Sequence, residues 1–246
     1  MKATVTFDTT PFVRVSIEGV VKTLLEQGAT VAAIDLADAP REPKALGPAH
    51  LHGGVDLADA AATQAAFDAI ASQHGGLHGL VNIAGGFAWE KVQGGALDTW
   101  DRMYQMNVRT AVAASQAALA HLPDGGRIIN IGANGAVKAG AGMGAYAASK
   151  AGVMRLTEAL AEELKDRGIT VNALLPSIID TPANRKDMPD ADPARWVAPA
   201  DLARVNEQIE LEIAERRLTE QELRKTQADL IQAGKLAGLG QMSAAL

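Results

Sequence analysis

Two residues in this sequence are well suited to proton chemistry: Tyr146 and Lys150, which stand four positions apart in an Ala-rich stretch. Four residues make about one helical turn, so on a helix the two side chains share one face. A phenol with a pKa of about 10 exchanges its proton poorly at neutral pH, but a neighbouring ammonium favours the phenolate. The pair could therefore move a proton on or off an alcohol or carbonyl oxygen. An exposed pair that only supports its helix is the alternative that the spacing leaves open.

The elements that would position this pair follow the pattern of a parallel α/β sheet. From Ala29 to about Pro199, short runs rich in Val and Ile alternate with longer Ala-rich stretches. The runs are apolar on both faces, which is typical of strands covered by helices on both sides. We therefore expect a doubly wound, Rossmann-like sheet. The predicted strands are Thr30–Asp35, Gly79–Ile83, Gly126–Ile131 and Thr170–Leu175, and the predicted helices include Thr99–His121 and Tyr146–Arg167.

The composition excludes several classes of function. The 246 residues are 48% apolar and 21% charged, which suits one packed α/β domain with an appendage. The net charge of -6 argues against binding nucleic acid or an anionic membrane surface. The absence of Cys excludes disulfides, thiol catalysis and thiolate metal sites, and fits a cytoplasmic protein. We expect no signal peptide, no membrane span and no metal site.

Several motifs accompany Tyr146 and Lys150 in a fixed order along the chain. They are Leu80–Gly85 (LVNIAG), Met106–Val108 (MNV), Arg127–Ile131 (RIINI) and Val171–Pro176 (VNALLP). In this order and spacing, residues 20 to 201 resemble the short-chain dehydrogenase/reductase family. The resemblance implies a Rossmann-like fold, a nicotinamide cofactor, and hydride transfer to or from a small carbonyl compound or secondary alcohol.

The resemblance also assigns roles to residues of this sequence. Tyr146 would be the catalytic acid/base, Lys150 would lower its pKa and hold the nicotinamide ribose, and Asn107 would support a proton-relay water. Besides Tyr146 and Lys150, the cofactor would be bound by Asn82, Ala84, Gly85, Asp56, Leu57, Ile179 and Thr181. Two positions depart from the family pattern: Ile83 replaces an Asn, and Ser177 replaces a Gly.

Asp35 bears on the choice between NAD and NADP. It ends a predicted strand, where a carboxylate can accept hydrogen bonds from the adenosine ribose 2′-hydroxyl and repel a 2′-phosphate. We therefore expect NAD rather than NADP, with an exposed turn residue as the alternative interpretation of Asp35.

The largest departure from the family concerns the phosphate-binding turn. The family has a glycine-rich turn after its first strand, but here Thr6 is followed by a segment in which Gly19 is the first glycine. Without those glycines, the backbone of residues 7–19 is not expected to cradle a pyrophosphate. Alternating apolar residues instead predict a β-hairpin of Thr4–Phe7 and Phe12–Ile17, followed by a helix at Glu18–Gln27.

A second departure removes a hydrogen-bond donor from the expected catalytic set. The family places a Ser thirteen residues before its Tyr, and this sequence has Ala133 there. Losing one such donor commonly reduces the rate by about a hundredfold to a thousandfold. Asn134 is a nearby polar residue, but strand alternation would point its side chain the other way.

The C-terminal segment departs from the family as well. From Asp201 to Ala233 the chain has no Gly or Pro, which predicts a long helix. Residues 205–246 resemble the signalling helix that leads into the dimerisation domain of sensor histidine kinases. No His follows His121, so phosphotransfer by this segment is excluded. We therefore expect a Rossmann-like domain at residues 1–200, which lacks the family's last strand. We expect a second unit at residues 201–246, whose helix would form a coiled coil and make the protein a homo-oligomer. A helix that only packs on the domain as a tail is the alternative.

Two functions remain open at the level of sequence. The first is an oxidoreductase that uses NAD(H), with activity impaired by the departures above. The second is a catalytically silent Rossmann-like chimera or scaffold that oligomerises through its C-terminal helix.

Overall fold

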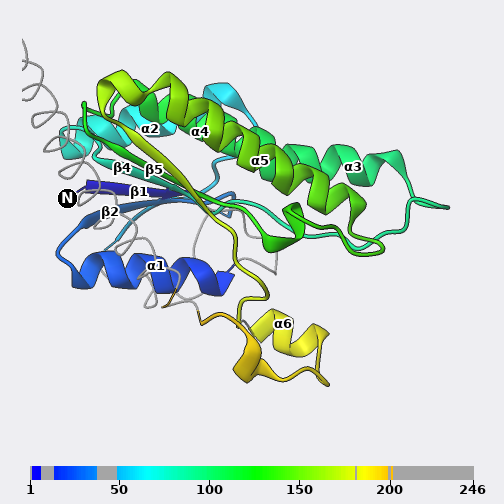
Figure 1. Ribbon diagram of the computed structural model, residues 1–246. Coiled ribbons are helices and arrows are strands. Elements are labelled where there is room, and N and C mark those ends of the chain that lie inside the picture. Colours follow the sequence, from blue (N-terminus) through cyan, green and yellow to red (C-terminus); the bar gives the residue numbers. More distant parts are fainter. Residues whose placement is uncertain (1, 7–13, 38–48, 181, 199–200, 202–246) are drawn as a thin grey trace, which may run out of the picture. The chain divides into compact units, whose positions relative to one another are not determined.

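The chain forms a six-stranded, fully parallel sheet with the order β3-β2-β1-β4-β5-β6 (Figure 1). The computed structural model describes residues 2–6, 14–37, 49–180, 182–198 and 201. This strand order is that of the doubly wound dinucleotide-binding fold, so the predicted fold class is confirmed. The strands are β1 (Lys2–Thr6), β2 (Thr30–Ile34), β3 (His50–His52), β4 (Gly79–Asn82), β5 (Arg127–Ile131) and β6 (Thr170–Leu174).

Helices cover both faces of the sheet. Figure 1 shows α1 on one face and α2, α4 and α5 on the other. All four residues of β4 are buried, as expected for a strand covered on both sides. One apolar core joins Phe67, Leu80, Ala114, Ile128 and Leu160, which come from two strands and three helices. The helices are α1 (Arg14–Glu26), α2 (Ala60–His74), α3 (Leu97–Tyr104), α4 (Thr110–Leu119), α5 (Gly144–Glu163) and α6 (Pro182–Asp187).

The predicted helix Thr99–His121 is interrupted in the structure. It begins at Leu97 as α3 and continues as α4, but a π-helical turn at Gln105–Arg109 separates the two. Such turns insert one extra residue and are frequent at functional sites. Asn107 lies in the middle of this turn.

The predicted N-terminal β-hairpin is not confirmed. β1 pairs in parallel with both β2 and β4, so neither edge is left for an antiparallel partner. Residues 14–17, expected in the second strand of the hairpin, lie in α1, which begins four residues before the predicted helix. Val21 is fully buried in that helix, and Ile17 precedes it by one turn, so the apolar residues also fit a helical period. Residues 7–13 lie outside the described part of the chain.

The predicted long helix and coiled coil fall on residues 202–246, which lie outside the described residues. The likeness of this segment to histidine kinases therefore stays a prediction. Within the described residues, no helix combines the length and the apolar character needed to cross a bilayer.

Candidate active site

A cavity of about 650 Å³ lies at the carboxyl ends of β4, β5 and β6. Its walls include the segments that follow these strands: Gly85–Phe87, Gly132–Gly135 and Pro176–Ile179. Tyr146 and Lys150 reach the same cavity from the first turns of α5. In folds of this class, ligands bind where the carboxyl ends of neighbouring strands meet. The structure therefore brings the two residues predicted to do chemistry into the expected place.

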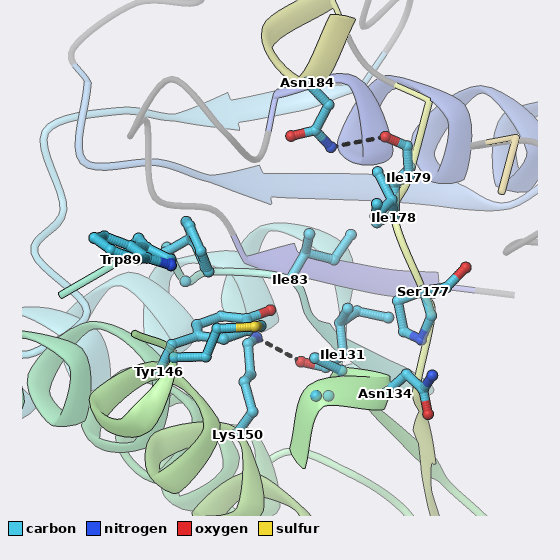
Figure 2. A pocket seen from close by; sticks show the side chains of 18 of the residues that line it. Ile83, Trp89, Ile131, Asn134, Tyr146, Lys150, Ser177, Ile178, Ile179 and Asn184 are labelled. Atoms are coloured by element: carbon cyan, nitrogen blue, oxygen red, sulfur yellow. Dashed lines mark hydrogen bonds between the residues drawn. The ribbon is translucent and has the colours of Figure 1, made fainter. Parts of the chain in front are cut away.

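Lys150 is held by a backbone carbonyl. Its Nζ donates a hydrogen bond to the Ile131 oxygen at the end of β5, at 2.8 Å (Figure 2). Burial disfavours the charged ammonium and lowers the pKa of Lys150 to about 8. An ammonium has three N–H donors, so two remain beyond this bond.

Tyr146 is half-buried and lies beside Phe87. The two rings meet edge to face, with centroids 4.9 Å apart and an interplanar angle of 76°. Burial disfavours the phenolate and raises the pKa of Tyr146 to about 12. The lowering of this pKa by Lys150 that the family resemblance implies stays a prediction; in the structure the Lys150 ammonium donates to the Ile131 carbonyl.

Asn107 joins two walls of the site. Its side-chain Oδ1 accepts a hydrogen bond from the Gly86 N–H at 2.9 Å, and its Nδ2 donates to the Gly86 oxygen at 3.1 Å. Nδ2 also donates to the Ser149 hydroxyl at 3.0 Å, and that hydroxyl donates to the Tyr146 carbonyl. Asn107 thus fixes the segment after β4 against α5. Sequence analysis did not select Ser149, although it lies inside the motif from Tyr146 to Lys150.

Gly85 is placed where only glycine fits. A Cβ there would collide with Oδ1 of Asn107 and come within 3.3 Å of the Lys150 ammonium nitrogen. The close approach of these groups explains the glycine in the motif after β4. Ala84 next to it is buried in the core.

Asn82 does not line the cavity. Its Nδ2 donates to the Ser115 hydroxyl at 3.1 Å and to Oδ1 of Asn130 at 2.8 Å, and Asn130 donates to the Thr157 hydroxyl. These four side chains are buried and link β4 and β5 to α4 and α5. The residue expected to bind cofactor therefore has a visible structural role. The sequence offers one signal for this network: Asn130 is a polar residue inside an apolar run, and buried polar side chains need hydrogen-bond partners.

Asp35 lies directly after β2 and is 7% exposed, which removes its interpretation as an exposed turn residue. Its Oδ1 accepts a hydrogen bond from the Ala37 N–H at 3.1 Å.

The other predicted cofactor residues have different surroundings. Asp56 accepts a hydrogen bond from the Ala58 N–H at 2.8 Å. The Leu57 side chain is part of the core. The last predicted cofactor residues are Ile179, which lines the cavity, and Thr181, which is outside the described residues.

Ala133 lines the cavity and offers no side-chain donor there. Asn134 lines it too, contrary to the expectation from strand alternation. The reason is that β5 ends at Ile131, and Asn134 begins a short 3-10 turn to Ala136, so alternation does not extend to it. Figure 2 shows Asn134 apart from the Tyr146 ring.

With this geometry established, comparison with known proteins identifies the family. A family model described as short chain dehydrogenase matches residues 18–192. The chain belongs to the short-chain dehydrogenase family. The matched region of this family member begins within α1 and ends at Asp192, so it contains every described lining residue of the cavity.

Two curated relatives and one solved structure illustrate the match. A short-chain dehydrogenase/reductase of Pyricularia oryzae is 33% identical over 181 residues, which cover 67% of this chain and 65% of that protein. D-threitol dehydrogenase of Mycolicibacterium smegmatis is 34% identical over 182 residues, 70% of each chain. A short chain dehydrogenase from Burkholderia cenocepacia, solved in complex with NADP, superposes with a TM-score of 0.69 at 32% identity and covers 82% of this chain and 87% of its own.

Proposed function

We propose that this short-chain dehydrogenase transfers hydride between NAD(H) and a small carbonyl compound or secondary alcohol, with Tyr146 as the acid/base. The observation that carries the proposal is the meeting of Tyr146 and Lys150 in one cavity at the carboxyl edge of the sheet. The family membership of residues 18–192 supports it.

The described residues fit a nicotinamide cofactor. The carboxylate of Asp35 is held at the end of β2, the usual place for a group that binds the adenosine ribose. The same charge would repel a 2′-phosphate, so we propose NAD over NADP, although the Burkholderia relative was solved with NADP. Lys150, Gly85 and Ile179 would hold the nicotinamide end. When bound, the cofactor supplies or accepts the hydride.

The protonation states of the two residues favour one direction of the reaction. Because the pKa of Tyr146 is raised to about 12, its hydroxyl keeps its proton at neutral pH and can donate it to a carbonyl oxygen. Lys150, with a pKa of about 8, is mostly charged at pH 7 and can offer its two further N–H groups to the cavity. The residues as they stand are therefore prepared for carbonyl reduction.

Substitution of the two tyrosines in the chain tests this proposal. Tyr146→Phe removes the proton donor and keeps the ring against Phe87, so we expect NADH-dependent ketone reduction to fall by about a hundredfold or more. The matched control is Tyr104→Phe in α3, where the ring is 55% exposed and lies outside the cavity lining. Equal activity in both variants would contradict the role of Tyr146.

A further inference from the structure

The cavity lining carries a group of apolar and aromatic side chains: Phe87, Trp89, Met143, Ile178 and Met188. The polar side chains Asn134, Ser177 and Asn184 line it too. Among the described residues that line the cavity, Lys150 is the one charged side chain, and it is bonded to the Ile131 carbonyl. These described lining residues thus include no arginine or second lysine that could neutralise a carboxylate or phosphate.

Trp89 packs against the backbone of the segment that precedes α5. The N–H of the following residue, Glu90, donates a hydrogen bond to the Gly142 oxygen at 2.8 Å. Gly142 has a φ of +77°, and a Cβ there would collide with the Trp89 indole, so the ring lies directly against this glycine. The Trp89 side chain is nevertheless 59% exposed and lines the cavity (Figure 2). A large, exposed indole that backbone contacts hold in place is available to a ligand.

Phe87 extends this aromatic surface to the reacting group. Its ring meets Tyr146 edge to face at 4.9 Å and is 38% exposed in the same cavity. Phe87 thus lies beside the Tyr146 ring, and Trp89 lines the same cavity, so a substituent of the carbonyl carbon could contact this aromatic surface. Aromatic rings prefer the edge-to-face and offset contacts that such neighbours offer.

Resting on the proposed function, we propose that the substrate class is an uncharged aryl ketone and the corresponding secondary alcohol, with the aryl group bound by Trp89 and Phe87. In reduction, the carbonyl carbon would receive hydride from NADH and the oxygen the Tyr146 proton, which gives NAD⁺ and the alcohol. The Tyr146 phenolate that remains would regain a proton from solvent. A polyol would bind to the polar lining side chains Asn134, Ser177 and Asn184 rather than to the aromatic pair, so it fits the surface at Trp89 and Phe87 poorly. The inferred specificity thus differs from the one named for the threitol relative.

The test compares three ketones in NADH-dependent reduction: acetophenone, its charged analogue 4-acetylbenzoate, and the polyol ketone erythrulose. We expect kcat/KM for acetophenone to exceed that for the other two by about a hundredfold. Trp89→Ala should lower kcat/KM for acetophenone by about tenfold and leave that for erythrulose nearly unchanged. The matched control is Trp100→Ala, since Trp100 lies outside the cavity lining. Equal or better use of erythrulose or 4-acetylbenzoate would overturn the proposed substrate class while leaving the oxidoreductase function intact.

A binding measurement separates the two proposals if none of the three ketones is reduced. That result counts against the oxidoreductase function, and saturation-transfer NMR then tests the aryl site directly. We expect acetophenone to bind the wild-type protein and the Trp100→Ala variant, and to bind Trp89→Ala more weakly by about tenfold. No acetophenone binding at millimolar concentration, or binding that Trp89→Ala leaves unchanged, would overturn the aryl site itself.

Discussion

At Lys150, the charge that the proposed reaction uses lowers the stability of the folded protein. Its ammonium is taken out of water and compensated by one carbonyl, so the charged form is disfavoured in the folded protein. A group in this state lowers folded stability at neutral pH. The folded protein would thus be more stable without this charge, which is common for ionisable groups in active sites.

The first prediction concerns the pH dependence of stability. The pKa of Lys150 is about 8 in the folded protein and 10.5 without the protein environment, so between these values only the unfolded chain binds the proton. Stability from this group therefore rises with pH across that window, by about 3 kcal/mol in all. Denaturant unfolding should show the wild-type protein gaining this much relative to Lys150→Met between pH 8 and 10.5.

The exposed Lys165 provides the control for that experiment, because its partner Glu162 lies on the surface. Lys165→Met should not reproduce the gain expected for Lys150, because the Lys165 side chain lies on the surface. A constant difference between wild type and Lys150→Met would show that the ammonium is not desolvated.

The second prediction concerns the missing donor at position 133. Ala133 lines the cavity where the family carries a Ser hydroxyl, so Ala133→Ser should supply a hydrogen bond to the developing oxyanion. We expect kcat for ketone reduction to rise by about tenfold to a hundredfold. Ala136→Ser, on the short turn outside the lining, should leave kcat unchanged. An unchanged kcat in Ala133→Ser would indicate that another group already provides the donor.

At the scale of elements, sequence patterns located the strands well and the connections poorly. β2 and β4 lie within one residue of their predicted bounds, because buried parallel strands are short, continuous apolar runs. The hairpin is not confirmed, because alternation within residues 12–17 carries no information about β1, whose two edges are both paired. The π-helical turn at Gln105–Arg109 leaves no sequence signal, since its apolar spacing resembles that of a regular helix.

The same limit explains how much of the site could be predicted. Tyr146, Lys150 and Gly85 form a local pattern, and the structure brings all three to the cavity. Asn82 follows the same pattern, but its side chain is directed into a buried network instead. Its partners stand more than thirty positions away in sequence, so only the fold reveals that they meet.

The third prediction tests this network, which links strands and helices beneath the site. Asn130 is fully buried and bonds both Asn82 and Thr157. Asn130→Ala removes one buried hydrogen bond from each partner and leaves a small cavity, so we expect a loss of about 2 to 4 kcal/mol in the free energy of unfolding, measured in urea. Gln64→Ala breaks an exposed hydrogen bond to Asp68 and should change it by less than about 0.5 kcal/mol. Similar values for the two variants would contradict a structural role of the network.

At the scale of the whole molecule, the proposed function requires one cofactor to bridge distant parts of the sheet. Its adenosine would lie at Asp35 after β2, and its nicotinamide at Lys150 in α5. Between these ends, the family uses a glycine-rich turn that this sequence lacks from Phe7 to Glu18. Oligomer formation through residues 201–246 stays a prediction, and cofactor binding across the sheet does not depend on it.

Calorimetric titration of the protein with NADH, with NADPH as comparator, tests the central claim most directly. The account predicts NADH binding with a micromolar Kd and NADPH binding weaker by about tenfold or more, because Asp35 disfavours a 2′-phosphate. That result would show that residues 7–19 accept a pyrophosphate without the usual glycines. Absence of binding heat at millimolar NADH and NADPH would contradict the oxidoreductase function and favour a catalytically silent scaffold.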